Sequence, residues 1–154
     1  MKAEYSNPFF GRKMIKKYPL IFSYQDLVEG NGFVARVEIQ GRVLLCDEGD
    51  GFWMYGVHPG GVAGGGTDCE TAMCQFKENY MAVLLDIAEE ASTFSQFKSQ
   101  VEEEFFSQDN PPNAIDWFKA LAEVRKTGVT LKDLNHVPCP DSMPACKWSI
   151  SKVK

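Results

Sequence analysis

The feature that most constrains the fold is a glycine-rich segment between an aromatic stretch and a long amphipathic one. Five of the seven residues from Gly60 to Gly66 are glycine. Such a run predicts either backbone with positive φ or the close approach of another part of the chain. Thr67 and Glu70 follow with the spacing of a capping box, which predicts that a helix begins at Thr67. The segment is therefore expected to be a tight connection from a strand to a helix.

The stretch after the glycines has the period of an amphipathic helix. Apolar residues recur at steps of three and four up to Ala91, and charged residues such as Lys77 and Glu78 fall between them. The pattern predicts one apolar face packed on a sheet. Its members are Ala72, Met73, Phe76, Tyr80, Val83, Leu84, Ile87 and Ala91.

The stretch before the glycines has the patterns of short strands. Alternation over 33–40 predicts one strand, and Gly41 is expected to end it. The apolar run 42–46 predicts a second strand, and the turn residues 48–51 lead into a third, aromatic strand over 52–57. An antiparallel meander is the simplest arrangement of the three.

The rest of the chain predicts two further helices and a late strand. Thr93 is expected to cap a helix over 94–106, and Asn113 a third helix that ends near Gly128. Alternation returns over 147–153. We expect an α+β fold: a basic segment 1–18, then one domain 19–154 with a small antiparallel sheet of three to five strands packed on the long helix. Its core spans about 33–91, its helical extension 92–135 and its last strand about 146–153.

Charge and cysteine content limit the functional classes. Residues 41–110 hold three Lys/Arg and thirteen Asp/Glu, which gives this block a net charge of −10, whereas the whole chain has a net charge of −5. This block disfavours binding to a phosphate backbone and favours binding to a basic protein partner. The alternative is a solvated acidic surface that only aids solubility. The five cysteines, without an apolar leader or membrane-length run, predict free thiols in the cytoplasm.

Several chemical readings are weaker than their structural alternatives. The glycine segment lacks the lysine of a phosphate-binding loop, and Asp68 and Glu70 would repel an anion. His58 could act as the base for a Cys69 or Cys74 nucleophile, as in a small enzyme, only if the fold brought the two side chains together. The zinc ligands suggested by His136, Cys139 and Cys146 lack a fourth member. The residues 47–50 suit a turn better than a cation site, and 113–134 makes a poor helix-turn-helix. We expect no catalytic residue, metal or cofactor.

One stretch resembles a known family, the HicB-like antitoxins. The order is Gly51-Phe52-Trp53, then Pro59-Gly60, then Gly66-Thr67, then Glu70-Thr71-Ala72, within 51 to about 87. The resemblance implies a partial RNase H-like ββ(β)αβ module, a homodimer or higher oligomer, that binds and masks a small basic RNA-cleaving toxin. In this chain Val57-His58 precedes Pro59-Gly60, where the family has Asp-Leu, and no DNA-binding domain is evident after it.

We therefore expect a non-enzymatic protein-binding module. The residues expected to contact the partner lie on the aromatic strand and the following turn: Phe52, Trp53, Tyr55, His58, Pro59 and Gly60. An RNA-binding module that uses the same face and the basic termini is the alternative. The third hypothesis is a small enzyme that uses His58 and a cysteine.

Overall fold

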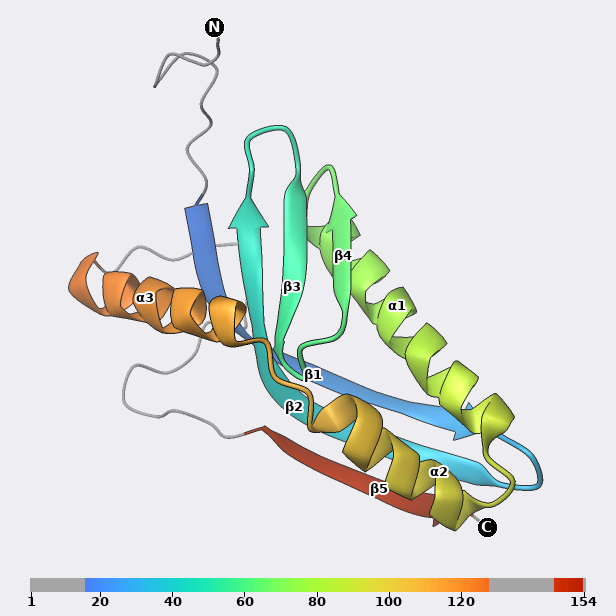
Figure 1. The fold of residues 1–154 in the computed structure, drawn as a ribbon. Coiled ribbons are helices and arrows are strands. Elements are labelled where there is room, and N and C mark those ends of the chain that lie inside the picture. The colour runs from blue at the N-terminus through green and yellow to red at the C-terminus, as the bar shows by residue number, and fades with distance from the viewer. Residues whose placement is uncertain (1–15, 128–145, 154) are drawn as a thin grey trace, which may run out of the picture.

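The computed structural model describes residues 16–127 and 146–153. They form an α+β fold in which a curled antiparallel sheet carries helices on both faces (Figure 1). Among the described residues, no helix has the length and apolar character needed to cross a membrane. The elements in chain order are β1 (Lys16–Glu29), β2 (Val34–Asp47), β3 (Phe52–His58), β4 (Ala63–Gly66), α1 (Cys69–Glu90), α2 (Phe94–Val101), the π-helical turn η1 (Glu102–Phe106), α3 (Pro111–Thr127) and β5 (Lys147–Val153).

The sheet branches at β2. Four strands follow the order β1-β2-β3-β4, and β1 pairs with β2 over its whole length. On its other side β2 pairs with β5 up to Gln40 and with β3 from Arg42 onward. The sheet also takes in part of the predicted basic segment 1–18, because β1 begins at Lys16.

The prediction of two strands within 33–46 was wrong, because β2 runs unbroken through Gly41. Gly41 lies where the pairing of β2 changes from β5 to β3, next to a register shift between Arg42 and Val43. A side chain there would collide with the backbone carbonyl of His58. The glycine therefore permits a close approach of two strands and does not end one.

The main core lies between the sheet and the helices α1 and α2. The helical stripe predicted from the sequence is confirmed, since Phe76, Tyr80 and Leu84 are buried on it. Tyr80 lies at the centre of an aromatic cluster, with ring centroids 4.8 Å from those of Tyr24 and Phe105. Burying an aromatic side chain of this size contributes roughly 1.5–3 kcal/mol to folding, so this cluster is a large part of what holds α1 on the sheet.

A smaller core lies on the opposite face, under α3. Trp117 of α3 is buried against Leu44 and Cys46 of β2, and its indole N–H donates to the Leu20 carbonyl at 3.2 Å. The guanidinium of Arg42 lies 5.4 Å from the centroid of the Trp117 ring. The sheet is thus buried on both faces at the end that carries β3.

Two of the predicted helix caps were wrong. Helix α1 is capped by Asp68, whose Oδ1 accepts from the Thr71 N–H at 2.7 Å and from the Thr71 hydroxyl at 2.8 Å. Strand β4 extends to Gly66, so the Thr67–Glu70 capping box does not form the helix start. Helix α3 begins at Pro111, and Asn110 accepts from the Asn113 N–H. Prolines suit first-turn positions, where backbone N–H groups lack helical acceptors.

The helix predicted over 94–106 is present, but it changes its winding near its end. Thr93 caps α2 by accepting from the Gln96 N–H at 3.1 Å, as expected. From Glu102 the backbone continues as the π-helical turn η1, and both Phe105 and Phe106 are buried there. The predicted late strand is confirmed as β5.

Candidate functional site

Trp53 is the exposed aromatic residue of β3. Its side chain is 41% exposed, and its ring stacks on that of Tyr55 with centroids 6.1 Å apart and planes 19° apart. On its other side the ring lies over Gly65 of β4, where an added Cβ would come 2.6 Å from the indole. The indole is therefore held on a strand that pairs with β2 on one side and β4 on the other.

The glycines of β4 explain the unusual sequence. None of the glycines from Gly60 to Gly66 has positive φ, which in the described residues occurs at Gly32 and Gly49. A Cβ at Gly64 would collide with the backbone of Phe76, and one at Gly66 would lie 2.7 Å from the Ala72 nitrogen. Gly64 and Gly66 thus let α1 pack directly on β4, while Gly65 makes room for Trp53. The second half of the predicted connection is a strand.

Carboxylates surround the end of the sheet that carries Trp53. Glu48 and Asp50 lie in the turn between β2 and β3, and Asp68 and Glu70 lie at the start of α1. The two turns are neighbours, because Phe52 pairs with Gly66 and Gly51 approaches the Gly66 carbonyl. Figure 1 shows the β2–β3 turn and the β4–α1 connection at the same end of the molecule. We call these four carboxylates the acidic end.

The ionisable groups at and near the acidic end differ in their hydrogen bonds and in the direction of their pKa shifts. Hydrogen bonds from Thr71 lower the pKa of Asp68 from its ordinary value of 3.8. Burial and the nearby Glu48 carboxylate raise the pKa of Tyr55, whose hydroxyl lies 3.5 Å from Glu48 Oε2. Lys17 of β1 lies at the same end of the sheet, but its ammonium is paired with Asp116 at 2.8 Å.

The three predicted residues of the turn are occupied by contacts within the protein. The His58 imidazole has Nε2 at 3.0 Å from the Phe106 carbonyl and Nδ1 at 3.0 Å from the Asp109 carboxylate. Pro59 follows a cis peptide bond and is buried. The Gly60 N–H donates to the Gln108 carbonyl at 3.0 Å. These residues join the end of β3 to the segment between η1 and α3.

The six residues expected to contact a partner thus fall into two groups. Trp53 and Tyr55 share the face of β3 toward α3, where Tyr55 also packs against the smaller core, whereas the half-buried Phe52 packs against the main core on the α1 side. His58, Pro59 and Gly60 lie at the other end of the strand, against residues 106–110. The structure brings Trp53 and Tyr55 together with the acidic end and does not bring the turn to it.

The geometry does not assemble a histidine–cysteine pair from the described residues. Both ring nitrogens of His58 face oxygen acceptors, and Cys74 is exposed on α1. Cys46 is buried in the core as predicted, and burial raises the pKa of its thiol to about 11. No group of three metal-ligating side chains occurs in the described ranges. His136 and Cys139 of the zinc suggestion lie outside those ranges, as does the predicted helix end at Gly128.

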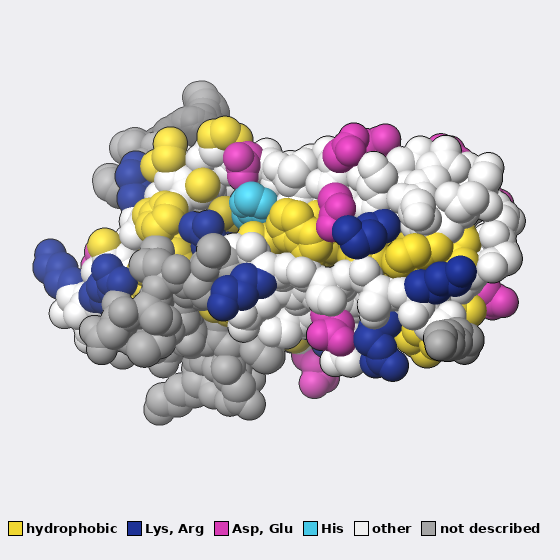
Figure 2. All heavy atoms as spheres, turned by 90° about the horizontal axis from the view of Figure 1, so that it is seen from below, with side chains coloured by type: hydrophobic (Ala, Val, Ile, Leu, Met, Phe, Trp, Pro, Cys, Tyr) yellow, Lys and Arg dark blue, Asp and Glu magenta, His cyan; other side chains and the backbone are white. Residues whose placement is uncertain are grey.

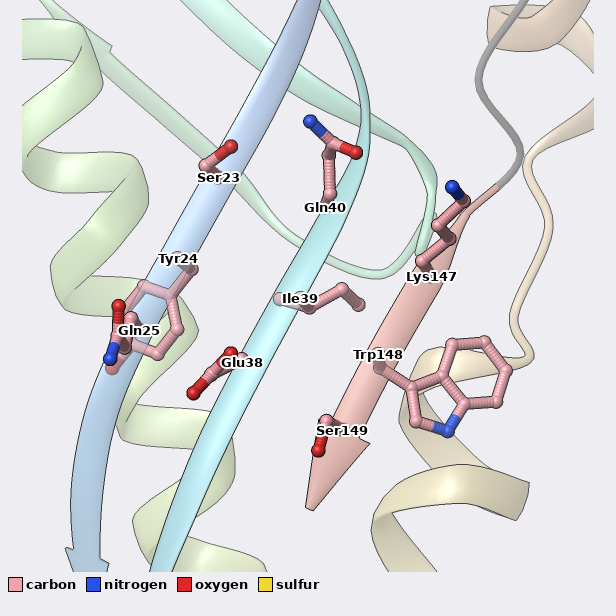
Figure 3. A pocket seen from close by; sticks show the side chains of 9 residues that line it. All are labelled: Ser23, Tyr24, Gln25, Glu38, Ile39, Gln40, Lys147, Trp148 and Ser149. Atoms are coloured by element: carbon pink, nitrogen blue, oxygen red, sulfur yellow. The ribbon is translucent and has the colours of Figure 1, made fainter.

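Sequence reasoning missed a polar groove on the open face of the sheet, on strands β1, β2 and β5. Its volume is about 520 Å³, and Figure 3 shows the side chains that line it. Ser23, Gln40 and Lys147 form one cross-strand row, and Gln25, Glu38 and Ser149 form the next. The signal is the alternation of polar with buried positions in β1 and β2, but the sequence patterns predicted no strand over 16–29.

Comparisons with protein-family models, with curated proteins and with solved structures give no match for this chain. The likeness to HicB-like antitoxins therefore rests on the residues of 51–87 alone.

Proposed function

We propose that this chain is a non-enzymatic binding module of the HicB-like antitoxin type, whose partner is a small basic, RNA-cleaving protein. The observation that supports it is the exposed Trp53, stacked on Tyr55 and placed beside the acidic end. The proposed contact surface consists of Trp53, Tyr55 and the carboxylates Glu48, Asp50, Asp68 and Glu70. In this proposal His58, Pro59 and Gly60 hold the strand in place.

The physical chemistry of such a surface suits a protein partner. A tryptophan near the centre of an interface often supplies more binding free energy than most other residues. Because the indole is already stacked on Tyr55 and lies over Gly65, ordering it on binding costs little conformational entropy. Carboxylates around it would speed the encounter with a basic protein and disfavour a phosphate backbone.

The experiment is capture of partners from native lysate on the immobilised full chain, with half of the lysate treated with ribonuclease. The proposal expects the same small basic protein in both halves. That protein, once purified, should cleave RNA, and a stoichiometric amount of this chain should stop the cleavage. Capture that disappears with ribonuclease treatment would instead identify RNA as the ligand, in line with the alternative reading. A captured protein without ribonuclease activity would contradict the antitoxin part of the proposal.

A further inference from the structure

The strands with an outer edge in the described sheet are β1, β4 and β5. An open strand edge presents backbone N–H and C=O groups that can pair with another strand, and proteins usually block such edges. Within the described residues, the edges of β4 and β1 are blocked and the edge of β5 is not.

The edge of β4 is blocked by side chains of α1. The Gly65 N–H donates to Gln75 Oε1 at 2.6 Å, and Asn79 Nδ2 donates to the Ala63 carbonyl at 2.7 Å. These two amides take up the backbone groups of β4 that point away from β3.

The edge of β1 is weakened at several points. Pro19 has no N–H to offer, and the Leu27 N–H donates to the neighbouring Asp26 carboxylate at 2.8 Å. Between them, Lys77 and Glu78 of α1 line a groove together with Ser23 to Asp26 of β1. A strand that approached this edge would have to displace charged side chains.

The hydrogen-bonding phase of the sheet shows which groups of β5 point outward. The Gly30 N–H donates to the Phe33 carbonyl at 2.9 Å and closes the β1–β2 hairpin. Because bonded and non-bonded pairs alternate in an antiparallel ladder, the register places the backbone of Gln40, Glu38 and Arg36 toward β5. Their partners Lys147, Ser149 and Ser151 face β2, so the N–H and C=O groups of Trp148, Ile150 and Lys152 point outward.

Within the described residues, nothing bonds to these outward groups of β5. Beside them the Trp148 side chain is 37% exposed, and its indole N–H donates to Glu102 Oε2 at 3.1 Å. Figure 2 looks from below onto the face of the molecule where Figure 1 draws β5 and α2. There a band of hydrophobic side chains runs between lysines and carboxylates.

We propose that β5 pairs antiparallel with β5 of a second copy of this chain, about a two-fold axis at Ile150. This register joins the outward backbone groups of Ile150 to their own equivalents and those of Trp148 to the partner's Lys152. The partner's Lys152 then lies beside the indole of Trp148, a favourable cation–π arrangement, and near Glu102, whose Oε2 also lies 3.0 Å from Lys98 Nζ of its own chain. Lys147 faces the partner's Val153, and Ser149 faces the partner's Ser151, so no like charges lie opposite each other.

Sedimentation equilibrium of the full chain over a range of concentrations tests this interface. The wild type should form a dimer. Lys152→Glu should raise the dimer dissociation constant at least about tenfold, because it places a carboxylate near the partner's Glu102. Lys152→Pro should abolish the dimer by removing an outward N–H. Lys147→Glu is the matched control: it makes the same charge change on the same strand, opposite the partner's Val153, and should leave the dimer intact.

Amide hydrogen exchange supplies an independent readout that does not depend on a variant folding well. The Ile150 N–H should exchange rapidly in dilute solution and become protected as the dimer forms, whereas the Ser149 N–H should stay protected at all concentrations. A chain that stays monomeric at about 500 µM, far above the micromolar affinity common for small interfaces, would overturn the proposal. A dimer that Lys152→Glu and Lys147→Glu weaken equally, or an Ile150 amide indifferent to concentration, would also overturn it.

Discussion

The indole of Trp53 covers Gly65 on the adjacent strand so closely that a single methyl group there would lie 2.6 Å from the ring. On the opposite face of the same strand, Gly64 and Gly66 lie against the backbone of α1. One short strand of glycines thus fixes both the main helix of the core and the exposed aromatic residue.

Alanine substitutions in β4 should separate these two roles. Gly64→Ala meets the backbone of Phe76 and forces α1 to move, so we expect a loss of about 1–3 kcal/mol and a fall in Tm of several degrees. Gly65→Ala meets a partly exposed side chain that can turn away, so the Tm should change much less. Thermal unfolding followed by circular dichroism checks both variants. Equal losses would mean that α1 does not depend on this close approach.

The hydroxyl of Tyr80 should be dispensable for stability. It is buried among aromatic rings and has no hydrogen-bond partner among the described residues, and burial raises its pKa. Because an unpaired buried hydroxyl carries a desolvation penalty, Tyr80→Phe should keep or increase the free energy of unfolding, by up to about 1–2 kcal/mol. Tyr24→Phe is the control, since its hydroxyl has a contact with the Met81 sulfur at 3.5 Å. Urea unfolding measures both, and a clear destabilisation by Tyr80→Phe would show that the hydroxyl has a partner in solution.

Thiol reactivity should follow burial. Cys74 is exposed, whereas the buried Cys46 and half-buried Cys146 have pKa values raised to about 11 by burial. Since the thiolate is the reactive form, iodoacetamide at neutral pH should modify Cys74 well before Cys46 or Cys146. Peptide mass spectrometry over time gives the order. Early modification of Cys46 in the folded protein would contradict its placement in the core.

Acid should weaken the start of α1. Because Thr71 donates to the Asp68 carboxylate, the pKa of Asp68 is lower in the folded than in the unfolded chain. Its contribution is therefore complete above the unfolded value of about 4 and is lost as pH falls through the folded pKa. The amide of Asp68→Asn can cap the helix but does not titrate there. The Tm of the wild type should thus fall more between pH 6 and pH 3 than that of Asp68→Asn, and parallel curves would contradict this assignment.

Elements fixed by local pattern could be predicted from the sequence. The helix expected over 67–91 is observed as Cys69–Glu90, because its apolar period needs no knowledge of the rest of the chain. The late strand was likewise recognisable from alternation, and the aromatic strand from its composition and the turn residues before it. Caps were misplaced by one to three residues because Thr67 and Asp68, or Asn110 and Asn113, are all suitable capping residues.

Features fixed by distant contacts could not be predicted. A glycine at position 41 suggested that the strand ends there, but the His58 carbonyl packs over Gly41 and leaves no room for a side chain. His58 was expected to contact a partner from the turn after the aromatic strand, but it contacts Phe106 and Asp109, about fifty residues away in the same chain. The glycine segment allowed either positive φ or close approach, and only the packing of α1 shows that the second applies.

Titration of the captured basic protein against two variants measures whether Trp53 anchors it, as proposed. Trp53→Ala removes the exposed indole of β3, and Phe118→Ala, the control, removes a ring of similar exposure (45%) on α3. We expect Trp53→Ala to weaken binding by at least about thirtyfold, the loss of an interface anchor worth about 2 kcal/mol, and Phe118→Ala to leave it unchanged. Unchanged binding by a folded Trp53→Ala protein would contradict the claim.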